Sequence, residues 1–343
     1  MTMSLMMQEL LYAPEALQKV LTTNLAVAKA IAERVQKENI SLIYTAARGT
    51  SNNAAAYFKY ICSLKTGIAV SKFDMSLATK YQKMTKAQNA LIIGISQSGQ
   101  STDVIKTVQA AKEKGAVAVA VTNNPESELA KLSDYHLFLN CGEEKSVAAT
   151  KTFTLQVANL SLLASLLAQE KEPDFEKISK DMTLFSQSLL GVKELAEKTK
   201  DMDNIIILSR GEMLPIAEEL GLKLMETSYK LTKCYSVAEF AHGPYALIEK
   251  ERVVIMLAPD GIFNEDFELM ASRLKGDGAK IILFTDIQKM YDNHDEGFLI
   301  PYKKDSQALL FINTIQAFAA YVAEACGKDP DKPRGLKKVT LTI

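Results

Sequence analysis

The sequence is poor in the residues that build metal and redox sites. It has three histidines and four cysteines, and no two cysteines form a C-x-x-C pair. The cysteines are scattered along the chain as Cys62, Cys141, Cys234 and Cys326. This spacing is typical of reduced structural thiols in a cytosolic protein rather than of disulfides or a zinc site. We therefore expect no bound metal and no disulfide.

Excess charge and long apolar runs are also missing. The 40 Lys and Arg against 41 Asp and Glu give a net charge of −1, so no basic field points to nucleic acid or a membrane surface. The longest apolar-rich stretch is expected near 157–168, where polar residues interrupt it before it could span a bilayer. The N-terminus lacks the basic segment and apolar core of a secretory signal. We expect a cytoplasmic protein that binds neither nucleic acid nor membrane.

Two nucleotide-binding fingerprints are absent as well. The sequence contains no G-x-x-x-x-G-K-[ST] P-loop, and no G-x-G-x-x-G follows the first predicted strand. We therefore expect no nucleotide or other cofactor.

Short, continuous apolar segments alternate with helical patterns. The segments predicted as strands are 41–46, 90–95, 116–122 and 135–140, and helices are predicted over 102–113 and 147–169. Continuous apolar runs of this length are typical of buried parallel strands, and strand alternating with helix favours a sheet covered on both faces. The fold class is therefore α/β, with mostly parallel sheets flanked by helices.

The second half of the chain repeats the first. Arg48-Gly49 after the first strand matches Arg210-Gly211, at an offset of 162 residues. ALIIGISQSG (90–99) matches RVVIMLAPDG (252–261) at the same offset, and VAVAVT (117–122) matches KIILFT (280–285) at 163. Ordered matches at nearly constant spacing indicate two similar α/β domains.

These matches define the expected domain organisation. A helical arm over 1–35 precedes the first domain at 36–170, and a mostly helical connector over 171–199 leads to the second domain at 200–326. The tail over 327–343, rich in Pro and Lys, is expected to lie over the surface.

Two hydroxyl-rich turns follow strands of the first domain: Gly49-Thr50-Ser51, and the SQSGQS segment 96–101. Ligands of open α/β sheets bind beyond the carboxyl ends of the strands, where helix N-termini offer N–H groups to anions. The turns therefore predict a phosphate-ester site, although such residues also simply cap helices. The second domain has Ala258-Pro259-Asp260 in place of Ser96-Gln97-Ser98. Because Asp260 repels anions and Pro259 has no N–H, only the first domain is expected to bind phosphate.

A predicted helix carries three charged residues on one face. Glu219, Lys223 and Glu226 are spaced by four and three residues. A carboxylate beside a phosphosugar can move a proton between adjacent carbons, since it acts as both base and acid. The alternative is that Glu226 is only a solvated partner of Lys223.

Histidine and lysine supply the remaining candidates. His242, in the turn HGP, has the local setting best suited to catalysis, whereas His136 lies in an apolar strand pattern and His294 in a charged loop. A histidine can protonate a ring oxygen near neutral pH, and a lysine can form an imine with a ketose carbonyl. Lys337 and Lys338, before the strand-like VTLTI, are either such a lysine pair or plain surface charge.

Six ordered motifs resemble a known family. GTS, SQSGQS, SVAATK, E-x(6)-E, HGP and the PRGLKK tail are similar to the isomerase half of glucosamine-6-phosphate synthase, which consists of tandem sugar isomerase (SIS) domains. The resemblance extends over nearly the whole chain. It implies two tandem SIS lobes, in agreement with the duplication.

The resemblance also implies roles for individual residues. The implied catalytic residues are Glu226 as the proton-shuttling acid/base, His242 in ring opening, Lys338 in imine formation, and Glu219. The implied substrate-binding residues are Gly49, Thr50, Ser51, Ser96, Gln97, Ser98, Ser101, Val147, Ala149 and Lys223. In the family the HGP histidine reaches the neighbouring subunit's site, so the resemblance implies a homodimer with shared sites and a small-molecule phosphosugar substrate.

Some features depart from the synthase. No N-terminal glutaminase domain with its nucleophilic cysteine is found, Ser101 stands where the synthase has Thr, and Ala149 where it has Ser. The chain thus resembles stand-alone SIS-type glucosamine-6-phosphate deaminases, with fructosamine-6-phosphate deglycases as the alternative. A non-catalytic SIS module that senses a phosphosugar is a third possibility; such regulators usually carry a helix-turn-helix domain, for which the first 35 residues are too short.

Overall fold

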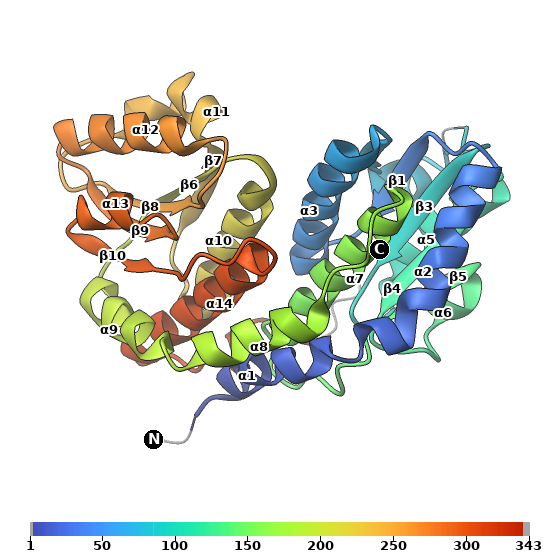
Figure 1. The fold of residues 1–343 in the computed structure, drawn as a ribbon, viewed down its shortest axis with the longest axis horizontal. Coiled ribbons are helices and arrows are strands. Elements are labelled where there is room, and N and C mark those ends of the chain that lie inside the picture. Colours follow the sequence, from blue (N-terminus) through green and yellow to red (C-terminus); the bar gives the residue numbers. More distant parts are fainter. Residues whose placement is uncertain (1–2, 85, 339–343) are drawn as a thin grey trace. The chain divides into compact units, whose positions relative to one another are not determined.

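The computed structural model describes residues 3–84 and 86–338 (Figure 1). The strand-like VTLTI segment, 339–343, lies outside the described residues. The chain divides into two compact units. Lobe one comprises Tyr12–Lys145, Ala149–Ser179 and the C-terminal residues from Lys337, and lobe two comprises the N-terminal residues up to Leu11, Ser146–Ala148 and Lys180–Leu336.

Lobe one is built on a five-stranded parallel sheet in the order β2-β1-β3-β4-β5. Its strands are β1 (Leu42–Ala46), β2 (Ala69–Lys72), β3 (Ala90–Ile95), β4 (Val117–Thr122) and β5 (Tyr135–Phe138). One face is covered by α2 (Val20–Lys37), α3 (Gly49–Thr66) and α7 (Lys151–Leu167), and the other by α4 (Met75–Thr79), α5 (Thr102–Glu113) and α6 (Glu128–Leu132) (Figure 1). Strands β3 and β4 are buried at every residue, which explains their uninterrupted apolar sequences.

Lobe two repeats this architecture with its own five-stranded parallel sheet, in the order β10-β9-β8-β6-β7. Its strands are β6 (Ile205–Ser209), β7 (Thr232–Ser236), β8 (Val253–Ala258), β9 (Lys280–Thr285) and β10 (Glu296–Leu299). The helices are α9 (Leu189–Thr199), α10 (Leu214–Ser228) and α14 (Gln307–Ala325) on one face, and α11 (Val237–Ala241), α12 (Asn264–Gly276) and α13 (Gln288–Asp292) on the other (Figure 1). Two short 3₁₀ turns, Gly211–Met213 and Pro244–Leu247, complete it.

The two sheets have the same strand order when the order of lobe two is read in reverse. β7-β6-β8-β9-β10 corresponds to β2-β1-β3-β4-β5, so the internal repeat is a repeat of topology as well as of sequence. This confirms the predicted fold class of two α/β lobes. The remaining helices, α1 (Leu5–Leu17) and α8 (Phe175–Ser186), each contribute residues to both units.

Two details of the sequence interpretation are corrected. The helix expected over 147–169 begins only at Lys151, because the residues before it are held in an irregular segment described below. The longest apolar helix is α14, not the 157–168 stretch. By length and composition α14 could cross a membrane, but 78% of its apolar window is buried within the protein, where it packs against α9 and α10.

Candidate functional site

The turn that follows β3 is organised by its own serine hydroxyls. Ser96 Oγ lies 3.0 Å from Ser101 Oγ and accepts a hydrogen bond from Gly99 N at 3.2 Å, while Ser98 Oγ accepts from Gln100 N, also at 3.2 Å. The carbonyl of Gln97 accepts from Asn123 N at 2.9 Å, which ties the turn to the residues after β4. The result is a compact loop lined by hydroxyl and amide groups at the start of α5.

At position 99 this loop can accommodate only glycine. Its φ of +65° lies in the left-handed region, and a Cβ there would come within 2.2 Å of Ser127 Oγ. Any side chain would therefore strain the backbone and collide with the neighbouring turn.

The second hydroxyl-rich turn lies at the same edge of the sheet. β1 and β3 are adjacent and parallel, with Ala46 paired to Gly94, so the residues that follow the two strands emerge side by side. Gly49 adopts a φ of +50° at the start of α3, and Ser51 Oγ accepts a hydrogen bond from Gln156 Nε2 at 3.0 Å. This edge lies where the strand order changes direction, between β1 and β3, which is where open α/β sheets bind ligands. We name these two turns, residues 49–51 and 96–101, the cradle.

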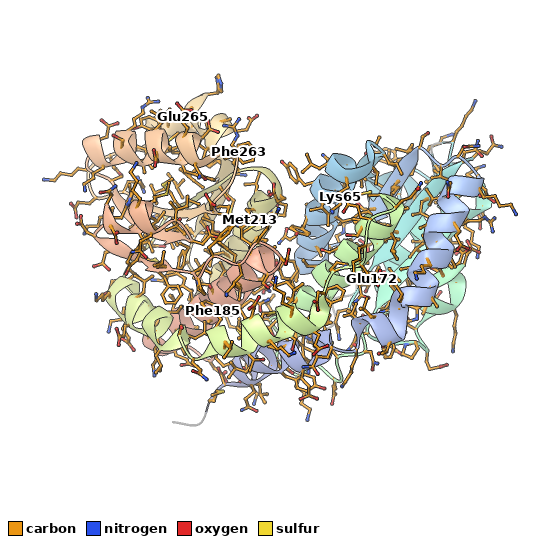
Figure 2. All side chains as sticks on the ribbon, in the orientation of Figure 1. Lys65, Glu172, Phe185, Met213, Phe263 and Glu265 are labelled. Atoms are coloured by element: carbon orange, nitrogen blue, oxygen red, sulfur yellow. The ribbon has the colours of Figure 1, made fainter. Side chains whose placement is uncertain are left out.

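An ion pair that sequence reasoning missed joins the two cradle turns. Arg48 Nε donates to Asp103 Oδ2 at 2.7 Å; the arginine side chain is 56% exposed and the aspartate 3%. Lobe two has the corresponding pair, Arg210 with Asp266, also at 2.7 Å. The Arg210 guanidinium stacks over the ring of Phe263 at 4.9 Å (Phe263 is labelled in Figure 2). Arg210 follows Arg48 by 162 residues and Asp266 follows Asp103 by 163, the same offsets as the sequence repeat. The repeat could therefore have pointed to this pair.

The corresponding turn in lobe two already holds an internal anion. Asp260 N donates to Asp286 Oδ1 at 2.6 Å, and Gln307 Nε2 donates to Asp286 Oδ2 at 2.7 Å. Burial raises the pKa of the Asp286 carboxyl, partly offset by these hydrogen bonds. In lobe one the matching residue is Asn123, whose neutral side chain bonds Cys141 and Gly142 instead. Lobe two thus places a carboxylate where the lobe one turn has an amide.

The three charged residues predicted to share a helix face do so on α10. Lys223 Nζ lies 3.5 Å from Glu219 Oε1 and forms a hydrogen-bonded ion pair with Glu226. The side chains of Lys223 and Glu219 are 1% and 0% exposed, whereas that of Glu226 is 24% exposed. Glu226 is therefore the carboxylate of this cluster that solvent or a ligand can reach.

The histidines differ in their surroundings. His242 is exposed in the turn after α11, and Gly243 beside it has a φ of +144° that favours glycine. Within the described residues the ring of His242 makes no hydrogen bond, to Glu226 or to any other group. His136, in β5, lies 2.9 Å from Thr122 Oγ1, and burial lowers the pKa of its ring. His294 bonds the carbonyl of Met290 through Nδ1.

The C-terminal lysine is held by a carboxylate that sequence reasoning overlooked. Lys338 Nζ donates to Glu144 Oε2 at 2.7 Å, and the Glu144 side chain is fully buried. Glu144 Oε1 also accepts from the backbone N–H groups of Thr150 and Thr152, each at 3.0 Å. These bonds hold the segment before α7 in place and explain why the helix begins at Lys151.

The other predicted substrate contacts lie in this same segment. Val147 and Ala149 are half-buried, and Val147 N donates to the carbonyl of Asp331 at 3.3 Å. Among the described residues no group of three or more His, Cys, Asp or Glu side chains is placed to hold a metal ion. All four cysteines are free, and burial raises the pKa of Cys62 to about 11 and that of Cys234 to about 12.

The chain matches the SIS domain family over residues 38–166 and 199–323, which contain every strand of both sheets. It belongs to the SIS domain family. It is 32% identical, over 98% of its length, to the isomerizing glutamine–fructose-6-phosphate aminotransferase of Sulfurisphaera tokodaii, of which it covers 56%. The chain spans about half the length of the curated relatives it matches.

Solved SIS structures share the whole fold. The C-terminal domain of glucosamine-fructose-6-phosphate aminotransferase from Francisella tularensis superposes with a TM-score of 0.83 at 25% identity, covering 96% of this chain and 99% of that one. Glucosamine-6-phosphate deaminase from Thermotoga maritima superposes with a TM-score of 0.79 at 22% identity, covering 99% and 100%. The second likeness shows the fold alone. Together these relatives place the chain among SIS proteins related to phosphosugar isomerases.

Proposed function

We propose that this protein is a phosphosugar isomerase/deaminase that acts on an amino-sugar 6-phosphate and releases ammonia. The observation that carries the proposal is the cradle of lobe one, which gathers the serine hydroxyls and a helix start at one edge of the sheet. Such an edge suits the phosphate of a sugar phosphate. The related synthase and deaminase, by their names, act on fructose and glucosamine 6-phosphates.

The acid/base step is assigned to Glu226. Its partly exposed carboxylate forms an ion pair with the buried Lys223, and it is the carboxylate of the α10 cluster that a ligand can reach. The buried Glu219 carboxylate lies 3.5 Å from the same ammonium. The resemblance assigns ring opening to His242 and imine formation to Lys338, and both assignments form part of the proposal.

The proposed reaction balances without a cofactor. Ring opening exposes an aldehyde at C1 beside the amine at C2. Glu226 removes the C2 proton to give an enolamine, and the proton returns to C1, which leaves an imine at C2. The Lys338 amine displaces ammonia from this imine and forms a lysine imine at C2, and water hydrolyses that imine to a ketose phosphate and the free lysine amine. In the reverse direction the same groups add ammonia to the ketose.

Ammonia and ketose release from a panel of sugars tests the proposal. We expect glucosamine 6-phosphate to yield equimolar ammonia and fructose 6-phosphate, and glucosamine without phosphate to yield neither, because the cradle would then be empty. The matched probe is galactosamine 6-phosphate, which differs at C4 alone. Amine release from fructosamine 6-phosphates only would indicate a deglycase, and binding without turnover of any sugar would indicate a sensing module. Either outcome would overturn the proposal.

A further inference from the structure

The carboxylate of Glu144 connects two segments of lobe one that are distant in sequence. Oε1 accepts the N–H groups of Thr150 and Thr152, and Oε2 accepts the Thr152 hydroxyl at 2.8 Å and Lys338 Nζ at 2.7 Å. The glutamate is thus bonded to the start of α7, a few residues away, and to the C-terminal segment, 194 residues away.

Because the Glu144 carboxylate is buried, it needs hydrogen-bond partners for both of its oxygens. The Glu144 side chain is 0% exposed, and an ionised carboxylate without partners would be strongly destabilising there. Three hydrogen bonds from the helix start and one from an ammonium satisfy both oxygens, and the partial positive charge of the helix N-terminus adds to them. The side chain of Lys338 is 26% exposed, compared with 0% for its partner.

We propose that Glu144 is the positioning residue of Lys338: it fixes the lysine ammonium at the start of α7 and so ties the C-terminal segment to lobe one. The consequence for chemistry rests on the proposed function. Imine formation joins Nζ to a carbonyl carbon with loss of water and requires the neutral amine, so Lys338 must leave this ion pair in order to react. Glu144 therefore determines where the amine stands before it reacts.

The two oxygens allow a selective variant. In Glu144→Gln the amide oxygen can still accept from the backbone N–H groups of Thr150 and Thr152, whereas the amide NH₂ that replaces Oε2 cannot accept from an ammonium. The Thr152 hydroxyl can accept from this NH₂ instead of donating to it. The helix start is retained and the lysine contact is lost. Glu143→Gln is the matched control, because Glu143 is exposed and contributes only its backbone carbonyl, which accepts from Lys151 Nζ at 2.6 Å.

Competitive acetylation with acetic anhydride, read by mass spectrometry, tests the contact in the full-length protein. The rate at Lys338 is compared with that at exposed Lys337. We expect Lys338 to react more slowly than Lys337 in the wild type and in Glu143→Gln. In Glu144→Gln the ratio of the two rates should rise about tenfold, the population change that follows loss of one charge-assisted hydrogen bond. An unchanged ratio would overturn the proposal.

A second variant guards against a folding defect in Glu144→Gln. Lys338→Met breaks the same contact from the other end, so it should speed trypsin cleavage after Lys337. The double variant should be cleaved no faster than either single variant, because both remove one shared interaction. Additive effects of the two substitutions would show that the residues act independently and would overturn the proposal.

Reductive trapping tests whether Glu144 positions the Lys338 amine for imine formation or only holds the C-terminal segment in place. With fructose 6-phosphate and cyanoborohydride, hydride adds to the imine carbon and leaves a stable secondary amine on Lys338. We expect a lower yield in Glu144→Gln than in Glu143→Gln; an equal yield would overturn the positioning role. If the wild type gives no adduct at Lys338 while the acetylation result holds, the proposed imine chemistry fails and the contact stands.

Discussion

Glu226 and Glu219 are both paired with Lys223, yet their surroundings give them different capacities. Lys223 and Glu219 are almost completely buried, so solvent does not reach the Glu219 carboxylate. Glu226 lies one turn further along α10 and keeps about a quarter of its side chain exposed. A group that exchanges protons with a ligand must reach it, and Glu226 meets this condition where Glu219 does not.

Glu226→Gln should therefore lower kcat by about 10²–10⁴-fold, the usual contribution of a general acid/base, while substrate affinity stays within a few-fold. The amide keeps the shape of the side chain but cannot take the C2 proton. Steady-state kinetics and exchange of the C2 proton with solvent deuterium measure both effects. Glu218→Gln, about two turns earlier on the same helix, serves as the control. Near-normal proton exchange in Glu226→Gln would mean that Glu226 is only an ion-pair partner of Lys223.

At the scale of elements, the turns after β3 and β8 occupy equivalent places but have opposite preferences for anions. In lobe one the turn ends in hydroxyls, and the neutral Asn123 lies behind it. In lobe two Asp260 Oδ1 accepts a hydrogen bond from Asn264 Nδ2 at 2.7 Å, and the Asp260 N–H donates to the Asp286 carboxylate. The donor that could have met a phosphate there already has an anionic partner.

Ser98→Asp should weaken binding of a sugar phosphate by about 100-fold or more, since a like charge facing the phosphate costs several kcal/mol. Asp260→Ser should leave affinity within about twofold, because Asp286 keeps the lobe two turn closed to anions. Titration calorimetry with glucosamine 6-phosphate measures both variants. Equal losses of affinity would contradict the assignment of phosphate binding to lobe one.

The buried strands and the edge strand β5 could be predicted from sequence, but the edge strands β2 and β7 could not. β3 and β4 are apolar throughout because helices cover both of their faces, and the structure places them within one residue of the predicted bounds. β2, with the sequence AVSK, is exposed at three of its four residues, and β7 is partly exposed throughout. Such strands carry no continuous apolar signal, so only the pairing of the sheet reveals them.

Local spacing revealed part of the candidate site. The i, i+4 and i, i+3 relations of the α10 cluster follow from helical geometry, so Lys223 and its two carboxylates could be grouped from the sequence. Glu144 could not be found in this way. Its contacts reach Thr150, Thr152 and Lys338, over separations of 6, 8 and 194 residues, and the longest of these depends on tertiary folding. The one hint in the sequence was the position of Glu144, an acidic residue shortly before a predicted apolar helix.

At the scale of the whole molecule, the two lobes have kept one topology while their turns have diverged. Both retain the strand order and the Arg–Asp pair beside the first turn, at Arg48 and Arg210. The pair is present in both lobes, although only the lobe two turn holds its own carboxylate. The features that differ, Ser96–Ser101 and Asp286, are those that decide whether an anion can bind.

The surroundings of His242 bear on how many copies of the chain form one site. His242 is exposed, and its ring makes no hydrogen bond within the described residues, which suits a residue that completes a site on a second copy of the chain. If the protein is a homodimer with shared sites, inactive His242→Ala and inactive Glu226→Gln subunits should complement each other. Random exchange makes half of the dimers mixed, each with one complete site of two, so activity should return to about a quarter of the wild-type value.

The matched control mixes wild-type subunits with the double variant. In those mixed dimers neither site has both residues, so an equal mixture should keep about a quarter of the activity of the same total amount of wild type. Sites built from one chain would instead keep about half, since each wild-type subunit would work regardless of its partner. Native mass spectrometry verifies that the subunits have exchanged. A mixture of the two single variants that stays inactive after verified exchange would show that His242 and Glu226 do not meet across a subunit boundary.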